Sequence, residues 1–332
     1  MTNLQAPFGA LAYFLDLDPP TADFLLDVKE GLSKDQKALS PMYFYDQRGS
    51  ALFDQITTLE EYYPTRTEAE LVVQNEAAIR DAIGPGVSIM EYGSGSSEKI
   101  RKLISLLDGA TSYIAMDISR DHLIENATNF AEASDLPVAA VCADFNSSFS
   151  LPEGHLPEAT RHLGYFPGST LGNLTPQDAS SFLQNASATL GEDALFLIGV
   201  DLKKNEQQLK AAYDDAKGIT AAFNLNLLHR MKTELGAIIE IDAFTHEARV
   251  KGGTNEQDTQ RIEMHLVAQR ETIIKVDNEE FHFRTGESLH TENSHKFTVK
   301  TMESIVKNTP WRILEWWTDD KDWFGSCLLS NS

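Results

Sequence analysis

The sequence predicts an α/β fold in which a parallel sheet forms one domain and a smaller α+β domain is inserted into it. Apolar runs of strand length alternate with helical patterns between residues 89 and 200, which is typical of βαβ units. From Asp201 the pattern changes to a helical stretch followed by short alternating segments. A glycine-rich turn, Gly93-Ser94-Gly95, follows the first apolar run and precedes a helical pattern. These observations indicate a ligand-binding α/β domain and a second, inserted domain.

The glycine-rich turn predicts a strand, a tight loop and a helix in succession. Glycines at 93 and 95 let the main chain turn sharply and let a ligand approach it. The dinucleotide fingerprint needs a third glycine where this chain has Glu98, a poor neighbour for a diphosphate. The next apolar run ends at Asp117, whose carboxylate can accept both hydroxyls of a ribose. This combination favours S-adenosylmethionine over NAD, although the glycines alone also suit an ordinary βα turn.

The other elements follow from the periodicity of apolar residues. In the first part of the chain we expect an amphipathic helix over 24–32, an aromatic segment over 41–50 that ends in a turn, a helix capped by Thr67 that runs to about Ile83, a strand over 113–116, a helix over 120–133, strands over 138–142 and 163–166, a helix over 176–190 and a strand over 194–200. After these we expect helical structure over 203–235, strands over 238–244, 261–267 and 272–276, and a closing hairpin within 311–329.

Four polar or glycine positions directly follow predicted strands. They are Gly93, Asp117, Asp144 and Asn173. In a parallel sheet, ligands bind beyond the carboxyl ends of the strands. We therefore expect these four residues to converge on one crevice and to form a cofactor site there.

Composition excludes several classes of partner. The 332 residues include 28 Lys and Arg against 50 Asp and Glu, for a formal charge of −22, which would repel nucleic acids and acidic membranes. The longest apolar stretch, Ala194–Val200, is far shorter than the roughly 18 residues of a membrane helix. Only two cysteines are present, Cys142 and Cys327, which argues against a disulfide framework and a cysteine-rich zinc site. We expect a cytoplasmic protein without a metal.

Several longer motifs resemble those of one enzyme family. They are Phe44–Asp46 with Gly49 and Ser50, Leu52–Ile56, Glu61–Arg66, Gly93–Lys99, Gly168–Pro176, Ala212–Ala216, Arg261–Met264 and Trp316–Asp319. In these motifs the chain is similar to the S-adenosylmethionine-dependent histidine Nα-methyltransferases, which open ergothioneine biosynthesis in bacteria and fungi. The resemblance extends from about residue 40 to the C-terminus. It implies a Rossmann-like class I methyltransferase domain with a second, smaller α+β substrate-binding domain.

The resemblance also implies roles for individual residues. The cofactor-binding residues would be Gly93, Lys99, Asp117, Asp144 and Phe145. The amino-acid substrate would be bound by Tyr62, Asn173, Tyr213, Glu292 and Ser294, with Met264 beside its ring. The space in which the amine meets the methyl group would be lined by Tyr45, Phe53 and Gly168. The chain departs from the family pattern at two positions. Pro167 stands where the family pattern has an apolar, strand-compatible residue, and Asn293 stands where it has a small apolar residue.

The side chains at 292 and 294 suit an imidazole ring. In extended chain they point the same way, and Glu292 can accept from one ring N–H while Ser294 bonds the other nitrogen. Without the family, a solvated polar loop is the alternative interpretation of Thr291–Ser294. Two other functions stay open: the same chemistry on tryptophan or another aromatic amino acid, and a non-catalytic S-adenosylmethionine-binding protein.

The predicted organisation assigns residues 1–66 and 203–292 to the substrate-binding domain. Residues 67–202 and 293–332 form the methyltransferase domain, and we expect the site to form between the two. The expected reaction is three successive methyl transfers to the α-amino group of L-histidine. The expected partners are L-histidine and its methylated intermediates, bound by a monomer, with neither nucleic acid nor membrane.

Overall fold

A computed structural model describes residues 3–19, 23–95, 98–253 and 259–331. The chain forms two compact units: unit 1 comprises Met1–Pro20, Thr67–Leu202 and Thr298–Ser332, and unit 2 comprises Thr21–Arg66 and Lys203–Phe297. These units differ from the expected domains at two boundaries. Residues 3–19 belong to unit 1, because the strand Tyr13–Asp16 pairs with Val138–Cys142, and residues 293–297 belong to unit 2, because the strand Ser288–Lys296 pairs with Gln260–Ala268.

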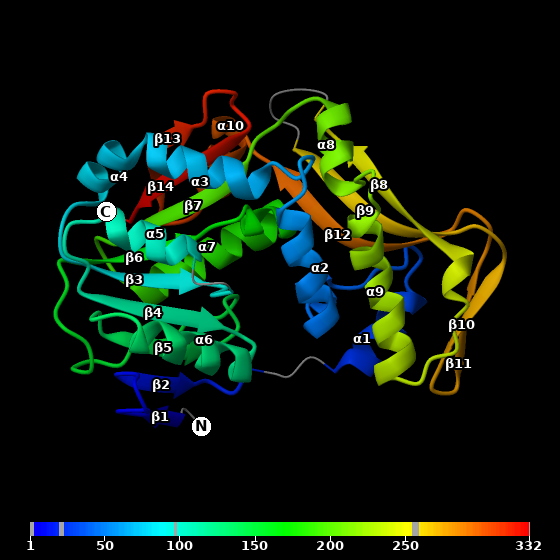
Figure 1. The fold of residues 1–332 in the computed structure, drawn as a ribbon, viewed down its shortest axis with the longest axis horizontal. Helices are drawn as coiled ribbons and strands as arrows, with labels where there is room; N and C mark the ends of the chain where they lie inside the picture. Colours follow the sequence, from blue (N-terminus) through cyan, green and yellow to red (C-terminus); the bar gives the residue numbers. More distant parts are fainter. Residues whose placement is uncertain (1–2, 20–22, 96–97, 254–258, 332) are drawn as a thin grey trace. The chain divides into compact units, whose positions relative to one another are not determined.

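Unit 1 contains a nine-stranded sheet in the order β1-β2-β5-β4-β3-β6-β7-β14-β13 (Figure 1). Its strands are β1 (Asn3–Gln5), β2 (Tyr13–Asp16), β3 (Val87–Tyr92), β4 (Ser112–Asp117), β5 (Val138–Cys142), β6 (Arg161–Phe166), β7 (Leu195–Asp201), β13 (Arg312–Thr318) and β14 (Phe324–Ser330). The pairs from β2 to β7 are parallel, whereas β1 and β14 run antiparallel to their neighbours. The last strand in the chain, β14, is thus an interior strand.

Helices cover both faces of this sheet. One face packs its alternate residues, such as Ile89 and Tyr113, against α3 (Pro64–Gln74), α4 (Glu76–Ile83), α5 (Glu98–Leu106) and α6 (Arg120–Glu132). The other face carries aromatic rings: Tyr92 and Phe196 pack on Phe182 of α7 (Pro176–Leu190), with centroids 5.6 and 5.8 Å away. α10 (Val299–Val306) packs against α7. Burial on both faces explains why the strands are almost wholly apolar.

The order of the strands places a switch point beside β3. The chain passes from β3 to β4 and β5 on one side, and then returns to β6 on the other side of β3. Ligands of open α/β sheets bind at such a point, outside the carboxyl ends of the strands. The glycine-rich turn after β3 lies at this position.

Three elements differ from those expected, and local chemistry explains the first two. The helix expected to start at Thr67 starts at Pro64, and proline suits a first helical turn. The turn expected near Gly49 is the first turn of α2 (Gln47–Thr57), because the Asp46 carboxylate accepts from the Gly49 N–H at 2.7 Å. The strand expected over 238–244 is a 3₁₀ helix, Ile241–Ala243, followed by β8 from Phe244.

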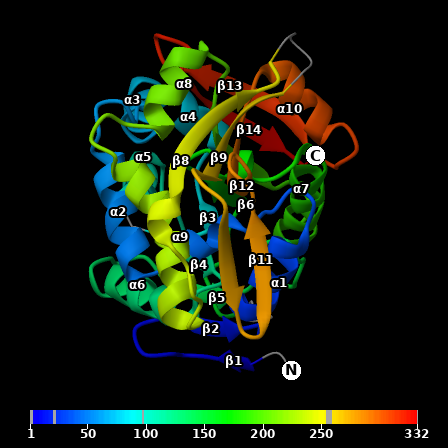
Figure 2. The ribbon, with the colours of Figure 1, turned by 90° about the vertical axis from the view of Figure 1, so that its right-hand side faces the viewer.

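Unit 2 combines helices with antiparallel strands (Figure 2). Its elements are α1 (Phe24–Ser33), a 3₁₀ helix (Pro41–Phe44), α2, α8 (Glu206–Tyr213), α9 (Ile219–Glu234), β8 (Phe244–Lys251), β9 (Gln260–Ala268), β10 (Thr272–Val276), β11 (Glu279–Phe283) and β12 (Ser288–Lys296). The strand order is β12-β9-β8 in one sheet, and β10 and β11 form a separate pair. α9 packs against α2, β8 and β9.

A β-bulge in β12 decides which side chains share a face. His290 pairs with His265 and Glu292 pairs with Met264, so Thr291 is an extra residue in the ladder. In a regular strand Glu292 would share a face with His290. The bulge instead places Glu292 on the other face of the sheet, where it is paired with Met264 of the neighbouring strand. Ser294 and Lys296 lie on that same face, because side chains alternate along the strand.

No helix in the described part of the chain is both long enough and apolar enough to cross a membrane. The same described residues contain no group of three or more His, Cys, Asp or Glu side chains arranged to hold a metal ion.

Candidate functional site

In unit 1, the glycine-rich turn is fastened to the end of β4. The N–H groups of Gly93 and Ser94 both donate to the carbonyl oxygen of Met116, at 3.0 and 2.9 Å. Gly93 has a φ of +73°, which favours glycine. No atom lies within 4 Å of a Cβ built on Gly93 or Gly95, so the main chain borders open space. Ser96 and Ser97 of this motif lie outside the described residues.

Two half-buried carboxylates follow neighbouring strands of unit 1. Asp117 ends β4 and accepts from the Ser119 N–H at 2.8 Å, and burial raises the pKa of its carboxyl group. Asp144 follows β5 and accepts from the main-chain and side-chain nitrogens of Asn146, at 2.9 and 3.0 Å. The Asp117 and Asp144 positions therefore present hydrogen-bond acceptors at the carboxyl ends of adjacent strands.

Phe145 adds an apolar surface next to these acceptors. Its ring packs on Phe166 of β6 and Phe182 of α7, with centroids 5.9 and 5.5 Å away. The Phe145 residue stays partly exposed.

The Gly168 loop is held by a carboxylate that the sequence analysis missed. Glu68 of α3 is 4% exposed, and its two oxygens accept from the Gly168 N–H at 2.9 and 3.1 Å. The Lys99 ammonium donates to the same carboxylate at 2.6 Å. Gly168 has a φ of +78°, and a Cβ there would lie 3.2 Å from the Lys99 nitrogen. No periodic signal marks Glu68, because its role depends on contacts with distant segments.

Two further residues of unit 1, Glu91 and Asn173, lie near the end of β3 and in the segment that follows β6. Glu91, near the end of β3, is buried and accepts from the Tyr113 hydroxyl at 2.6 Å. Burial raises its pKa to about 7. Asn173 ends a 3₁₀ helix, Thr170–Asn173, and is half-buried. Glu91 was not among the predicted residues.

In unit 2, four of the predicted residues form a chain of aromatic rings. The centroid distances are 5.6 Å from Tyr45 to Phe53, 6.3 Å from Phe53 to Tyr62 and 6.2 Å from Tyr62 to Tyr213. Phe223 of α9, which the sequence analysis missed, packs on Tyr45 and Phe53 at 5.7 and 6.0 Å. Edge-to-face contacts of this kind fix ring orientation.

Glu292 lies near enough to Tyr45 for its charge to act on the Tyr45 hydroxyl. Burial raises the pKa of its carboxyl group to about 7, and the charge of Lys296 opposes that shift. Displacement of water and the charge of Glu292 raise the pKa of the Tyr45 hydroxyl. Because Tyr45 is 47% exposed, solvent moderates the effect of burial there.

Thr291 anchors the bulge that directs Glu292 to this face. Its hydroxyl oxygen lies 3.0 Å from the Met264 carbonyl oxygen and 2.8 Å from the Asn224 side-chain oxygen, and its one proton is shared between these two acceptors. Both Thr291 and Asn224 are 0% exposed. Neither was among the predicted residues, since a β-bulge has no reliable signal in a single sequence.

The side-chain hydroxyls of Ser294 and Tyr213 are hydrogen-bonded to each other. Their hydroxyl oxygens are 2.7 Å apart, and the Lys296 ammonium donates to Ser294 at 2.7 Å and to Tyr213 at 3.0 Å. The structure therefore brings Tyr45, Phe53, Tyr62, Tyr213, Met264, Glu292 and Ser294 together within unit 2, and Gly93, Lys99, Asp117, Asp144, Phe145, Gly168 and Asn173 lie in unit 1.

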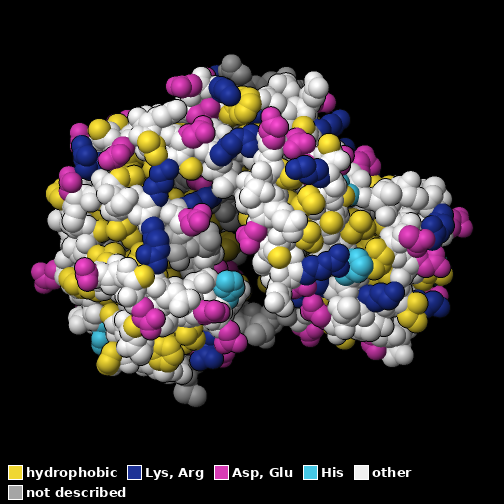
Figure 3. Space-filling model, in the orientation of Figure 1, with side chains coloured by type: hydrophobic (Ala, Val, Ile, Leu, Met, Phe, Trp, Pro, Cys, Tyr) yellow, Lys and Arg dark blue, Asp and Glu magenta, His cyan; other side chains and the backbone are white. Residues whose placement is uncertain are grey.

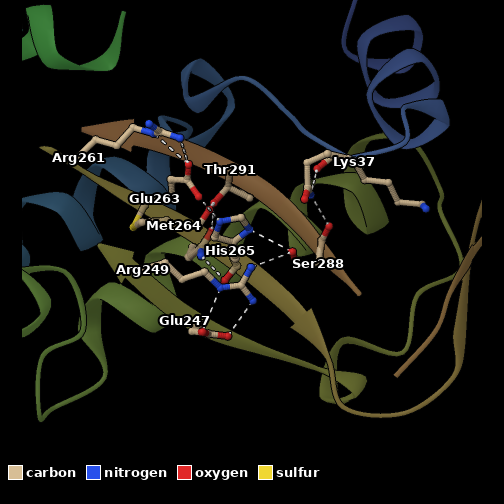
Figure 4. Close-up of polar contacts among 11 residues, drawn as sticks. Lys37, Glu247, Arg249, Arg261, Glu263, Met264, His265, Ser288 and Thr291 are labelled. Atoms are coloured by element: carbon tan, nitrogen blue, oxygen red, sulfur yellow. Dashed lines mark hydrogen bonds and ion pairs between the residues drawn. The ribbon is translucent and has the colours of Figure 1, made fainter. Parts of the chain in front are cut away.

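The opposite face of the β12-β9-β8 sheet carries a separate polar network (Figure 4). Arg261 pairs with Glu263 at 2.5 Å, and His265 bonds Glu263 and Ser288, each at 3.1 Å. Met264 lies between Glu263 and His265 on β9 and points to the other side. This network braces the strand that carries Met264, and it is not part of the candidate site.

The surface in Figure 3 shows acidic and basic side chains interspersed, without a continuous basic patch on that face.

Comparison with known proteins supplies the family. A family model described as "Histidine-specific methyltransferase, SAM-dependent" matches residues 24–331. A histidine N-alpha-methyltransferase of Mycolicibacterium smegmatis is 39% identical over 96% of this chain and 98% of its own. Its counterpart from Mycobacterium tuberculosis is 37% identical over 92% of this chain and 94% of its own. Ergothioneine biosynthesis protein 1 of Neurospora crassa is 27% identical over 89% of this chain, which corresponds to 33% of that longer protein.

The match covers almost the whole chain, including the glycine-rich turn of unit 1 and the bulged strand of unit 2. With its mixed, Rossmann-like sheet and its small antiparallel sheet, the chain belongs to the family of histidine-specific, S-adenosylmethionine-dependent methyltransferases.

Proposed function

We propose that this chain transfers methyl groups from S-adenosylmethionine to the α-amino group of L-histidine, three times, to give Nα,Nα,Nα-trimethyl-L-histidine for ergothioneine biosynthesis. The observation that carries the proposal is the 39% identity, over nearly the full length of both chains, to a histidine N-alpha-methyltransferase. The bulged strand of unit 2 supports it, because Glu292 and Ser294 offer an imidazole ring a carboxylate and a hydroxyl on one face.

The residues of unit 1 fit S-adenosylmethionine. Asp117 presents an acceptor for the ribose hydroxyls, Asp144 one for the adenine amino group, and Phe145 a flat apolar surface for the adenine ring. Lys99 can bind the carboxylate of the methionine part. The buried Ser94 hydroxyl has no hydrogen-bond partner among the described residues, which suits a ligand that supplies one. When bound, S-adenosylmethionine supplies a methyl group on a positively charged sulfur.

The substrate residues supply the complementary groups for an amino acid. The Asn173 amide and the Tyr62 hydroxyl can donate to the α-carboxylate, while the Tyr213 hydroxyl is hydrogen-bonded to Ser294. Glu292 accepts from an imidazole N–H, Ser294 bonds the other ring nitrogen, and Met264 lies opposite Glu292, beside the ring. These roles follow the family resemblance, and the grouping of the unit 2 residues supports them.

The chemistry requires a neutral amine, since an ammonium group has no lone pair for the methyl carbon. The Tyr45 hydroxyl, whose raised pKa keeps it protonated, can orient the nitrogen and pass the released proton to water. Its 47% exposure gives water access. The methyl group must approach the nitrogen to about 3 Å in line with sulfur, and the family resemblance assigns Phe53 and Gly168 to the space in which this happens. The amine loses one proton for each transfer.

We further propose that unit 1 is the methyltransferase domain, that unit 2 is the substrate-binding domain, and that the protein acts as a monomer. Mass spectrometry of histidine incubated with the protein and S-adenosylmethionine tests the function, with tryptophan in parallel. We expect histidine to gain one, two and finally three methyl groups. Methylation of tryptophan but not of histidine would show that tryptophan is the substrate. If neither amino acid is methylated, the protein is a non-catalytic S-adenosylmethionine-binding protein.

A further inference from the structure

Lys296 is a buried cation on the face of β12 that carries the ring-binding residues. It is 0% exposed and follows Glu292 and Ser294 at intervals of two residues beyond the bulge. Removing an ammonium group from water is costly. A lysine in this position therefore needs a physical reason.

The Lys296 ammonium closes a triangle with two hydroxyl groups. Its nitrogen is 2.7 Å from the Ser294 oxygen and 3.0 Å from the Tyr213 oxygen, and these two oxygens are 2.7 Å apart. The nitrogen also lies 4.6 Å from the centre of the Tyr213 ring. An ammonium group only donates hydrogen bonds. Both oxygens must therefore accept from Lys296.

This arrangement directs the remaining hydroxyl protons. When Tyr213 donates to Ser294, the Ser294 oxygen accepts two hydrogen bonds and its own proton is directed to a ligand. The face then presents one donor, Ser294, and one acceptor, Glu292. A neutral imidazole has one N–H and one bare nitrogen, so it matches this pair. An imidazolium, with two N–H groups, and an indole, with one, match it less well.

Lys296 also acts on the charge of Glu292. Burial raises the pKa of Glu292 to about 7, and the positive charge of Lys296 opposes that rise. The titratable groups around this site include the phenols of Tyr45 and Tyr213 and His246 of β8, and the raised pKa of Tyr45 keeps that phenol uncharged near neutral pH. His246 bonds the Tyr213 carbonyl oxygen at 2.7 Å, and burial lowers its pKa so that it stays neutral.

We propose that Lys296 is a positioning residue that determines specificity for the imidazole ring. It orients the hydroxyls of Ser294 and Tyr213, and its charge favours the ionised form of Glu292, which can accept from the ring. The inference rests on the proposed function, since it names what selects histidine.

The test is the affinity for histidine as a function of pH. Calorimetry is run on the S-adenosylhomocysteine-saturated protein between about pH 6 and pH 9, for wild type, Lys296→Met, Lys296→Gln and Lys296→Arg. At pH 7 the uncharged Met and Gln variants should bind histidine about tenfold to a hundredfold more weakly than wild type does. The midpoint of the pH dependence of histidine binding should rise by about one pH unit or more. Lys296→Arg keeps the charge and should leave the midpoint within about half a unit. The titration of histidine itself is common to all variants and cancels in the comparison.

Two further variants separate this role from a structural one. In a Glu292→Gln background, Lys296→Met should no longer displace the curve, because position 292 has nothing to titrate. Lys37→Met is the matched control: Lys37 is another largely buried lysine of unit 2, paired with Glu287 and 4.9 Å from the Phe283 ring. It should not change the midpoint of histidine binding.

Three results would overturn the inference. They are an unchanged midpoint in both Lys296→Met and Lys296→Gln, an equal displacement in Lys37→Met, and a displacement that persists without Glu292. Lys296→Gln keeps a side chain that can donate, so it covers the case in which Lys296→Met does not fold. Failure of the proposed function has a different signature, since wild type would then neither bind nor methylate histidine.

Discussion

The two groups of candidate residues are built in different ways. In unit 1, Gly93 and Asp117 directly follow strands, and hydrogen bonds with the main chain fix their loops. In unit 2, Glu292 and Ser294 lie on the face of a single strand, and their placement depends on a bulge and on bonds between side chains. The first arrangement is a property of sheet topology and tolerates changes of side chain. The second depends on a few particular side chains, so we expect changes there to alter substrate choice before they alter the fold.

The largest effect is expected from Glu292→Ala in the unit 2 group. The change removes the acceptor for an imidazole N–H, and leaving such a donor unpaired costs about 1–3 kcal/mol, or more when the lost partner was charged. Specificity for histidine should fall by roughly tenfold to several hundredfold, and discrimination against tryptophan should fall with it, since space opens opposite Met264. The measurement is kcat/KM for both amino acids. Affinity for S-adenosylhomocysteine is the control and should not change; an unaltered ratio of the two kcat/KM values would refute the ring assignment.

The next largest effect is expected from Asp117→Ala in the unit 1 group. A charge-assisted hydrogen bond to a ribose hydroxyl contributes about 1.5–3 kcal/mol, so S-adenosylhomocysteine should bind roughly tenfold to a hundredfold more weakly. The fold should persist, because Asp117 is half-buried and its carboxylate accepts a hydrogen bond from the adjacent turn. Calorimetry measures the affinity and circular dichroism checks the fold. Unchanged affinity would remove Asp117 from the cofactor site.

A smaller effect tests whether the bulge carries the substrate group. Thr291→Val keeps the volume of the side chain but removes the donor that bonds Met264 and Asn224 at 3.0 and 2.8 Å. Two buried acceptors lose a partner, so unfolding should become easier by about 1–3 kcal/mol. KM for histidine should rise several-fold while affinity for S-adenosylhomocysteine stays the same. Thr245→Val, at a site where the hydroxyl is bonded by exposed Gln269, is the control; if both variants behave alike, the bulge has no special part in the site.

The last prediction concerns acid stability instead of ligand binding, and the effect should come from unit 2. His265 and His295 are buried there, and burial lowers the pKa of each to about 4, below the usual value of about 6.5. On acidification the unfolded chain takes up these protons first. Their contribution to stability is therefore complete above about pH 6.5 and is lost between about pH 6.5 and 4, by roughly 2–3 kcal/mol for each histidine.

Urea unfolding followed at several pH values measures this loss. The double variant His265→Gln, His295→Gln should show a flatter dependence on pH over the same interval than wild type does. A wild-type midpoint that does not move between about pH 7 and pH 5 would show that these two histidines are not held neutral in the folded protein.

Much of unit 1 could be predicted from the sequence. Strands β3 to β7 are buried on both faces and therefore read as apolar runs, and helices with one apolar stripe separate them. The positions of Gly93, Asp117, Asp144 and Asn173 after strands followed from the same pattern. By contrast, β1 and β2 are short, and their place in the sheet depends on pairing with β5, more than 120 residues away in the sequence. Pairing at that distance leaves no local signal.

The missed residues share a physical cause. Glu68 acts through Gly168 and Lys99, Thr291 through Met264 and Asn224, and each bond joins segments far apart in the chain. Lys296 was not predicted from the sequence either, because a lysine is expected on the surface and only the fold shows that this one is buried. The family resemblance supplied the residues that would touch ligands, whereas the residues that support them had to come from the structure.

The interior position of β14 has a consequence for how the protein is made. Its partner β7 is complete by residue 201, but β14 is formed only by residues 324–330. During synthesis the hydrogen-bonding edge of β7, whose seven residues are all buried in the finished sheet, therefore has to wait for the end of the chain. An apolar edge that stays open this long is a template for wrong pairing. Newly made chains should consequently depend on chaperones, or on slow translation, until the last strand leaves the ribosome.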